Sequence, residues 1–173
     1  MRIVAKFGGT SVANGDRVNR AADSIAAAVE AGHEVAVVVS AMGSTTDHLL
    51  DEMKFEASEQ DRAEIVSMGE RTSVRMLKGA LEARGVDATF LEPGWDDWPI
   101  VTDEYGEVDV GETKRRVAGC TETMAEGTVP VITGFLAQDH EGSITTLGRG
   151  GSDTTAVMLG NYMDADEVVI VTD

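Results

Sequence analysis

The chain contains little cysteine, little positive charge and no long hydrophobic run. Cys120 is the single cysteine among 173 residues, so an internal disulfide is excluded and no thiolate zinc or redox site is expected. No apolar stretch approaches the roughly 18 residues of a membrane span, and the first residues lack the basic and apolar regions of a secretion signal. These absences predict a cytoplasmic globular protein without redox chemistry or structural zinc.

Basic residues are outnumbered more than two to one. The sequence has 31 acidic and 14 basic residues, a formal net charge of −17, and only four lysines: Lys6, Lys54, Lys78 and Lys114. Such a surface repels nucleic acid. Because the acids are spread along the chain and do not form a tail, the charge predicts a solvated surface suited to high salt, where screening weakens self-repulsion.

Strand and helix patterns alternate along the chain, which predicts one α/β domain with a mostly parallel sheet and helices on both faces. The expected strands are 2–7, 33–41, 87–93, 129–136, 143–147 and 167–173, and the expected helices are 16–31, 45–53, 61–84, 112–126 and 152–163. The long helix is expected to carry Ile65, Met68, Thr72, Met76 and Leu81 on one side. Segment 94–111 is irregular and is expected to be a surface excursion, with short strands at "PIVT" and "EVDV".

The stretch "KFGGTS" ends the first expected strand. It puts the charge of Lys6 beside Gly8 and Gly9, where backbone without Cβ atoms can approach a ligand closely, as a polyphosphate requires. Taken alone, the stretch is equally typical of a tight turn with a lysine in solvent.

A second glycine-rich stretch, "TTLGRGGSDTTA", precedes the helix expected at 152–163. Gly148, Gly150 and Gly151 surround Arg149, and Ser152 or Asp153 is expected to cap the helix, whose first amides favour an anion. The guanidinium of Arg149 suits a carboxylate or phosphate. Neither stretch has the spacing of a Walker A loop or of a GxGxxG fingerprint, which argues against a P-loop NTPase and a Rossmann dehydrogenase.

Two further positions are candidates for binding. Ser40, Thr45 and Thr46 follow the second expected strand, and loops at the carboxyl ends of such strands bind ligands in open α/β sheets; Thr46 or Asp47 is equally suited to a plain helix cap. Glu70, inside the long helix, is the other candidate. The alternative to a binding role is an exposed glutamate that pairs with a nearby arginine. The three histidines have no serine or cysteine partner arrangement that would suggest a catalytic triad.

Together, these stretches resemble the amino acid kinase superfamily and, within it, the aspartate kinases. The matching segments, in the family's order, are "KFGGTSV", "VVVSAMGSTTDHLL", "GERTS", "VPVITGF", "TTLGRGGSDTTA" and "ADEVVIVTD". They span nearly the whole chain. Their combination is more specific than a leading lysine, which glutamate 5-kinase, acetylglutamate kinase and uridylate kinase of the same superfamily share.

The resemblance implies transfer of the γ-phosphoryl group of ATP, with Mg²⁺, to the side-chain carboxylate of L-aspartate, the first step towards lysine, threonine and methionine. It implies catalytic roles for Lys6 and Asp153, with Asp153 orienting the lysine or the metal-bound phosphates. Phosphate or nucleotide contacts are implied for Lys6, Gly8, Gly9, Ser40, Thr172 and Asp173. Substrate contacts are implied for Thr46, Glu70, Arg149, Gly150, Gly151 and Ser152.

Members of the family continue beyond the point that matches Asp173, through further nucleotide-binding residues to regulatory ACT domains. Residues 1–173 are therefore expected to be the N-terminal, substrate-binding part of a kinase catalytic domain, acting as a homo-oligomer or with a missing C-terminal half. The loss of later strands is expected to leave an exposed sheet edge. Two alternatives stay open: a non-catalytic module of the same fold that serves dimerisation or partner binding, and another carboxylate or carbamate kinase.

Overall fold

The computed structural model describes residues 1–148 and 150–172, so Arg149 and Asp173 lie outside the described residues. Five parallel strands form the central sheet in the order β3-β4-β2-β1-β7: β1 (Arg2–Phe7), β2 (Glu34–Val39), β3 (Ala88–Leu91), β4 (Val129–Thr133) and β7 (Glu167–Val171). A separate antiparallel hairpin joins β5 (Leu136–Gln138) to β6 (Ile144–Thr146). The expected α/β fold with a mostly parallel sheet is confirmed.

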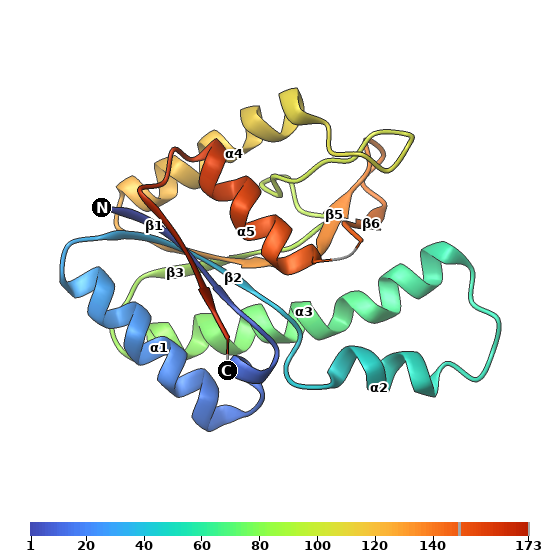
Figure 1. The fold of residues 1–173 in the computed structure, drawn as a ribbon, viewed down its shortest axis with the longest axis horizontal. Coiled ribbons are helices and arrows are strands. Elements are labelled where there is room, and N and C mark those ends of the chain that lie inside the picture. The colour runs from blue at the N-terminus through green and yellow to red at the C-terminus, as the bar shows by residue number, and fades with distance from the viewer. Residues whose placement is uncertain (149, 173) are drawn as a thin grey trace.

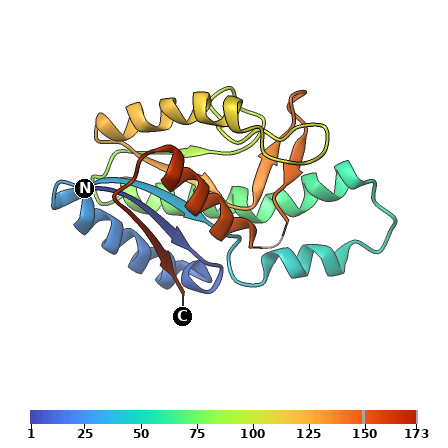
Figure 2. The same ribbon diagram turned by 45° about the horizontal axis from the view of Figure 1, so that its top comes forward.

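Helices cover both faces of the sheet (Figures 1 and 2). The helices are α1 (Gly15–Glu30), α2 (Thr45–Glu52), α3 (Glu59–Glu82), α4 (Val110–Ala125) and α5 (Gly151–Tyr162). One buried cluster joins α1 and α3 to alternate strand residues such as Val37 and Val131, and a second joins α4 and α5 to their neighbours Val38 and Ile132. This alternation is why β2 is apolar from Val35 to Val39: its side chains enter two cores.

Three expectations about the irregular parts are wrong. In place of the two short strands, segment 94–111 forms only isolated bridges, at Val101, Thr102 and Val108. Its middle is core and not a surface excursion, since Trp98 and Ile100 are fully buried. The strand expected at 129–136 breaks into β4 and β5 at Gly134 and Phe135, because Phe135 has a φ of +70°. The chain therefore leaves the sheet at this point and enters the hairpin.

The side of α3 expected to be apolar does not exist as one face. Leu81 is fully buried against the sheet, whereas Met68 and Met76 are 53% and 43% exposed on the outside of the helix. The sheet-facing side instead carries Val66, Val74, Leu77 and Leu81, together with the polar Ser67, Glu70 and Ser73. α3 thus has one buried face and one exposed apolar stripe.

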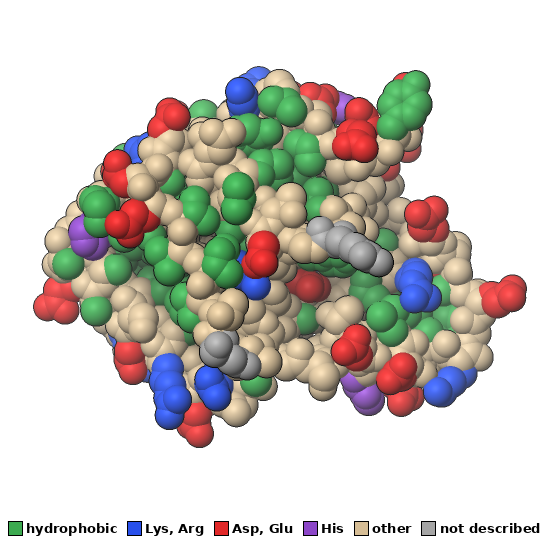
Figure 3. Space-filling view, viewed as in Figure 1, with side chains coloured by type: hydrophobic (Ala, Val, Ile, Leu, Met, Phe, Trp, Pro, Cys, Tyr) green, Lys and Arg blue, Asp and Glu red, His purple; other side chains and the backbone are tan. Residues whose placement is uncertain are grey.

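The expected exposed edge is present at β7. Val168, Val169 and Ile170 are 37–39% exposed, and apolar side chains gather over β7 and α5 on the face shown in Figure 3. Acidic side chains are scattered over the same view without forming one patch. Within the described residues, no helix is long and apolar enough to cross a membrane.

Candidate active site

Lys6 and Asp153 form the charged centre of the site. Lys6 is the fifth residue of β1, the strand next to the β7 edge of the sheet, and lies between Val38 of β2 and Ile170 of β7. Its side chain leaves the sheet on the α5 side, where Nζ lies 2.9 Å from Oδ1 of Asp153 in the first turn of that helix. Lys6 is only 8% exposed, while the Asp153 side chain is 56% exposed. A nearly buried ammonium group is therefore paired with a carboxylate that reaches solvent.

Gly8 and Gly9 follow the lysine and are tightly packed. A Cβ on Gly8 would lie 3.3 Å from the Lys6 Nζ, and a Cβ on Gly9 would lie 2.9 Å from the carbonyl oxygen of Ala41. The carbonyl of Gly9 also accepts a hydrogen bond from the Gly43 amide at 2.9 Å. Glycine is needed at position 9 because the loops after β1 and β2 touch through their backbones.

Ser40 connects the second strand to α5. Its hydroxyl donates to Oγ of Ser152 at 3.0 Å, so the carboxyl end of β2 is bonded to the first turn of the helix. Gly134, at the end of β4, lies against the same serine, since an added Cβ would be 2.5 Å from Ser152 Oγ. Two strand ends and one helix start therefore meet around Ser152.

The start of α5 differs from the expected cap. Gly150 is the N-cap residue, with a φ of +69° and no side-chain hydrogen bond, and Ser152 and Asp153 lie in the first turn of the helix. Gly151 packs so tightly against Phe135 that a Cβ could not be placed there. The first amides of the helix are without intrahelical partners and face the loop side, where an anion is favoured.

Glu70 is buried, and the alternative of an exposed helical glutamate is wrong. It is 5% exposed, and burial raises the pKa of its carboxyl to about 7, although hydrogen bonds from its own amide and from the Ala41 amide act against the shift. The preceding residue, Gly69, allows α3 to approach Ala41 this closely, because a Cβ at position 69 would lie 2.7 Å from the Ala41 Cβ. Glu70 therefore meets the loop that begins with Ser40.

Thr46 lies in the first turn of α2, whose N-cap is Ser44, so the alternative that Thr46 or Asp47 caps this helix is wrong. It opens onto a cleft of about 840 Å³ that Phe135, Thr145 and Thr146 also line. Gly69 brings the threonine close to Glu70, since a Cβ at position 69 would be 3.5 Å from Thr46 Oγ1. The cleft is large enough for a small amino acid, and its lining residue Phe135 packs against Gly151 at the start of α5.

Phe135 and the amide of Ala41 were not expected from the sequence. A non-glycine residue at positive φ is uncommon and is often found at functional sites. The signal was present in "VPVITGF", where Gly134 interrupts an apolar strand. The predicted nucleotide-binding residue Thr172 is exposed. It lies close to the loop after β1, because the Gly8 amide donates a hydrogen bond to the carbonyl of the preceding residue, Val171, at 3.4 Å.

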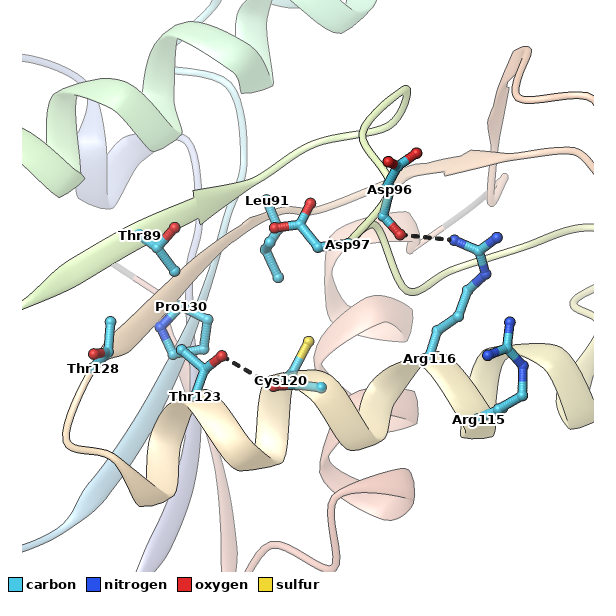
Figure 4. Close-up of a pocket in the computed structure, with 11 residues that line it drawn as sticks. Thr89, Leu91, Asp96, Asp97, Arg115, Arg116, Cys120, Thr123, Thr128 and Pro130 are labelled. Carbon is cyan, nitrogen blue, oxygen red and sulfur yellow. Dashed lines mark hydrogen bonds between the residues drawn. The ribbon is translucent and has the colours of Figure 1, made fainter.

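A second cavity lies between α4 and the β3 edge of the sheet (Figure 4). Its volume is about 560 Å³, and Asp97, Arg116 and Cys120 are among its lining residues. The Arg116 guanidinium is already bonded to Glu112 and to the carbonyl of Trp98. Burial, with a contribution from Asp97, raises the pKa of the Cys120 thiol to about 12, which leaves it unreactive at neutral pH. Of the predicted catalytic and binding residues that the structure describes, none lines this cavity, and two strands separate β3 from β1.

Comparisons with known proteins agree with the sequence resemblance. The model of the amino acid kinase family matches residues 1–173. The chain is 42% identical to an aspartokinase of Thermus thermophilus over 176 residues and 37% identical to one of Geobacillus stearothermophilus over 175 residues; each alignment covers 99% of this chain and 42% of the relative. The chain therefore spans about 42% of the length of these curated relatives.

Two solved structures have the same fold. Aspartate kinase from Synechocystis superposes with a TM-score of 0.78 at 36% identity, over 99% of this chain and 28% of that one. Aspartokinase III from E. coli, in complex with aspartate and ADP, gives a TM-score of 0.85 at 27% identity, over all of this chain and 49% of that one. With a family model that matches every residue, the chain belongs to the amino acid kinase family.

Proposed function

We propose that this chain supplies the aspartate site and the phosphoryl-transfer corner of an aspartate kinase. The observation that carries the proposal is the Lys6–Asp153 ion pair at the carboxyl ends of the central strands, beside the amide end of α5. Open α/β sheets bind ligands at such strand ends. The relatives named aspartokinase and the E. coli complex with aspartate and ADP support the choice of substrates.

In the reaction, an oxygen of the aspartate side-chain carboxylate attacks the γ-phosphorus of ATP. The bond between that phosphorus and the bridging oxygen of ADP breaks, and the products are 4-phospho-L-aspartate and ADP. Little covalent help from the protein is needed, because catalysis rests on position and on neutralising the charge of the transferred group. The Lys6 ammonium is suited to this neutralisation, since it is buried and its counter-ion Asp153 can orient it.

The amino acid is proposed to lie in the cleft by Thr46, with its ammonium group facing Glu70. A carboxyl with a pKa near 7 ionises readily when a cation approaches, so binding would release a proton below neutral pH. Arg149 is proposed to pair with a substrate carboxylate, and Gly150, Gly151 and Ser152 to line its path. Gly8, Gly9, Ser40, Thr172 and Asp173 are proposed to line the phosphate path.

Mg²⁺ is proposed to arrive with the nucleotide. Within residues 1–148 and 150–172, no group of three or more carboxylates, histidines or cysteines could hold a metal ion. Phosphate oxygens and water would therefore provide most of the coordination, with Asp153 as a nearby carboxylate. The ion would supply charge neutralisation on the β- and γ-phosphates.

Isothermal titration of L-aspartate into the chain tests the proposal. We expect binding that weakens at least tenfold in Glu70→Ala and in Arg149→Ala, because each removes a charged partner of the substrate. Glu64→Ala is the matched control, since Glu64 is an exposed acid on the same helix. Unchanged affinity in the first two variants would contradict the site, and preference for another carboxylate in a substrate screen with ATP would reassign it within the family.

The acidic surface is proposed to be an adaptation to high salt in the cytoplasm. With a net charge of −17, screening should raise stability, so the thermal midpoint of unfolding is expected to rise between 0.1 M and 2 M KCl. A midpoint that falls over this range would contradict the proposal.

A further inference from the structure

Two buried hydroxyl groups have no hydrogen-bond partner among the described residues. They are Oγ of Ser73, in α3, and Oγ1 of Thr133, the last residue of β4. Ser73 is 1% exposed and Thr133 is fully buried. Buried polar groups are nearly always hydrogen-bonded, because an unpaired one costs free energy. These two hydroxyls therefore have a donor capacity that the fold itself does not use.

Both hydroxyls lie on the α3 side of the sheet. Val131 of β4 enters the core under α1 and α3, so Thr133, two residues later, points to the same side. Ser73 lies on the buried side of α3. The α5 helix, with the ion pair at its start, lies on the other side of the sheet (Figure 1). The two hydroxyls therefore belong to the surroundings of Glu70, which is on the buried side of the same helix as Ser73.

The two hydroxyls are also at the same level along the strands. Thr133 is the Cα partner of Val39 in the pairing of β4 with β2, and Glu70 lies beside Ala41, two residues beyond Val39. α3 runs antiparallel to the strands, because it leads from the carboxyl end of β2 to the amino end of β3. Ser73 follows Glu70 by three residues, which is about 4.5 Å back along the sheet and level with Thr133.

We propose that Ser73 and Thr133 are positioning residues for Glu70, whose ionised carboxylate accepts hydrogen bonds from their hydroxyls when the ammonium group of the substrate pairs with it. An ionised carboxylate has about four acceptor positions, more than one ammonium contact and the Ala41 amide occupy. The hydroxyls can rotate towards a new acceptor without movement of the backbone. The inference rests on the proposed function, since it assigns partners to the carboxylate that is proposed to hold the amino acid.

Among the described residues, no charged side chain on the surrounding elements could take this role. β3, β4 and β6 contain no charged residue, and the one in β2 points to the other side of the sheet. The charged residues of α1 and α2 are exposed. Arg71, which follows Glu70, is paired with Glu92 at 3.0 Å. The two unpaired hydroxyls are therefore the donors available to Glu70 on the side of the sheet.

Aspartate affinity as a function of pH tests the inference. Thr133→Val and Ser73→Ala remove the hydroxyls and nearly keep the shapes of the side chains. If the hydroxyls favour the ionised form of Glu70, each variant should bind L-aspartate about tenfold more weakly at pH 6, where the carboxyl must lose its proton to bind. The loss should shrink towards pH 8.5, where the carboxyl is increasingly ionised before binding. Isothermal titration at several pH values measures both effects.

Stability separates this role from a structural one. At pH 6 the unfolding free energy of both variants should be unchanged or higher, because an unpaired buried hydroxyl does not stabilise the fold. Thr113→Val is the matched control. Thr113 is a buried threonine of α4 whose hydroxyl accepts a hydrogen bond from the Val101 amide at 3.2 Å, so this variant should lose stability and keep its aspartate affinity. Lower stability with unchanged affinity in Thr133→Val and Ser73→Ala would overturn the inference.

Urea unfolding without substrate tests the same hydroxyls independently of the proposed function. Their removal should raise the Glu70 pKa further, so the fall in stability between pH 6 and pH 8.5 should be larger than in the parent chain. In Glu70→Gln, Thr133→Val should leave the pH profile unchanged. A larger fall in a chain that does not bind aspartate would support the link to Glu70 and contradict the proposed substrate. Aspartate binding with an identical pH profile in Thr133→Val would overturn the inference and leave the proposed function intact.

Discussion

The amino and carboxyl ends of the strands differ in how their glycines are packed. Gly32, Gly85 and Gly127 follow helices at the amino end, have φ values of +76° to +92°, and have no heavy atom within 4 Å of an added Cβ. At the carboxyl end, Gly9 and Gly134 have ordinary φ values, but an added Cβ would lie within 3 Å of a neighbour. One set allows the chain to turn, and the other allows loops to come together.

The two basic residues of β1, Arg2 near its amino end and Lys6 near its carboxyl end, also differ in what they contact. Arg2, at the start of the strand, is bonded to Glu34 at 2.9 Å and to the carbonyl of Met163 at 2.6 Å, which ties chain segments together. Lys6, near the other end of the strand, makes one ion pair with a half-exposed partner and faces the loops. The Arg2 guanidinium donates to partners within the fold from both Nε and Nη1, whereas the Lys6 charge lies beside the loops, where a ligand could reach it.

The largest effect is expected from exchanging the cations of β1. Lys6→Met should weaken binding of tripolyphosphate, a probe for the phosphates of ATP, at least tenfold, and should lower any aspartate-dependent release of ADP roughly a thousandfold. Its stability should change little, because Asp153 can be solvated. Arg2→Met should leave tripolyphosphate affinity unchanged and cost about 1 kcal/mol of unfolding free energy. Calorimetry measures the tripolyphosphate affinity and urea unfolding measures the stability of each variant. Equal affinities in Lys6→Met and Arg2→Met would contradict a special role for the cation at the carboxyl end of β1.

Glycines on either side of β4 offer the next comparison. Gly134→Ala should cost about 2–3 kcal/mol, because the new methyl group meets Ser152 and separates it from Ser40. Gly127→Ala should cost about 1 kcal/mol, from the positive φ alone. Aspartate binding should fall in the first variant and persist in the second. If both variants lose stability equally and both bind aspartate, close packing at the carboxyl end has no bearing on the site.

Local patterns were enough to predict the elements and the motifs. The strands, the helices and the glycine-rich stretches follow from apolar periodicity and from residues within one turn of each other. The residues meeting at the site could be expected from parallel strand ends, and the pairing of Lys6 with Asp153 followed from the resemblance. The features that were not predicted depend on contacts between residues far apart in the sequence. The burial of Glu70 depends on Gly69 meeting Ala41, and the burial of Trp98 depends on a loop with no periodicity of its own.

The two sides of α3 show the same limit. Periodicity identifies apolar positions but does not say which of two stripes faces the sheet, because Met68 and Leu77 are equally apolar in a sequence. The structure assigns the buried side to Val66, Val74, Leu77 and Leu81. Phe135 escaped prediction for another reason: its positive φ is a property of the junction between two sheets, which a single apolar run conceals.

The smallest effect concerns pH and compares two buried carboxylates at the carboxyl end. Burial raises the Glu70 pKa from 4.5 to about 7, so the native state binds more protons than the unfolded state between these values, and stability falls as pH rises. From pH 6 to pH 8 the loss should be about 1 kcal/mol. Burial acts on Glu92 in the same direction, but hydrogen bonds and charges from Arg75 and Arg71 outweigh it and lower the Glu92 pKa, so its contribution is lost only as pH falls below 4.5.

Urea unfolding at pH 6, 7 and 8 separates the two carboxylates. Glu70→Gln should flatten the decline between pH 6 and pH 8, because the titrating group is gone while a neutral side chain of similar shape remains. Glu92→Gln should lower stability by a similar amount at all three values, since Glu92 is ionised throughout and its arginines lose their partner at each pH. An unchanged slope in Glu70→Gln would mean that the buried carboxyl of α3 is ionised in the native state, and that substrate binding does not displace a proton from it.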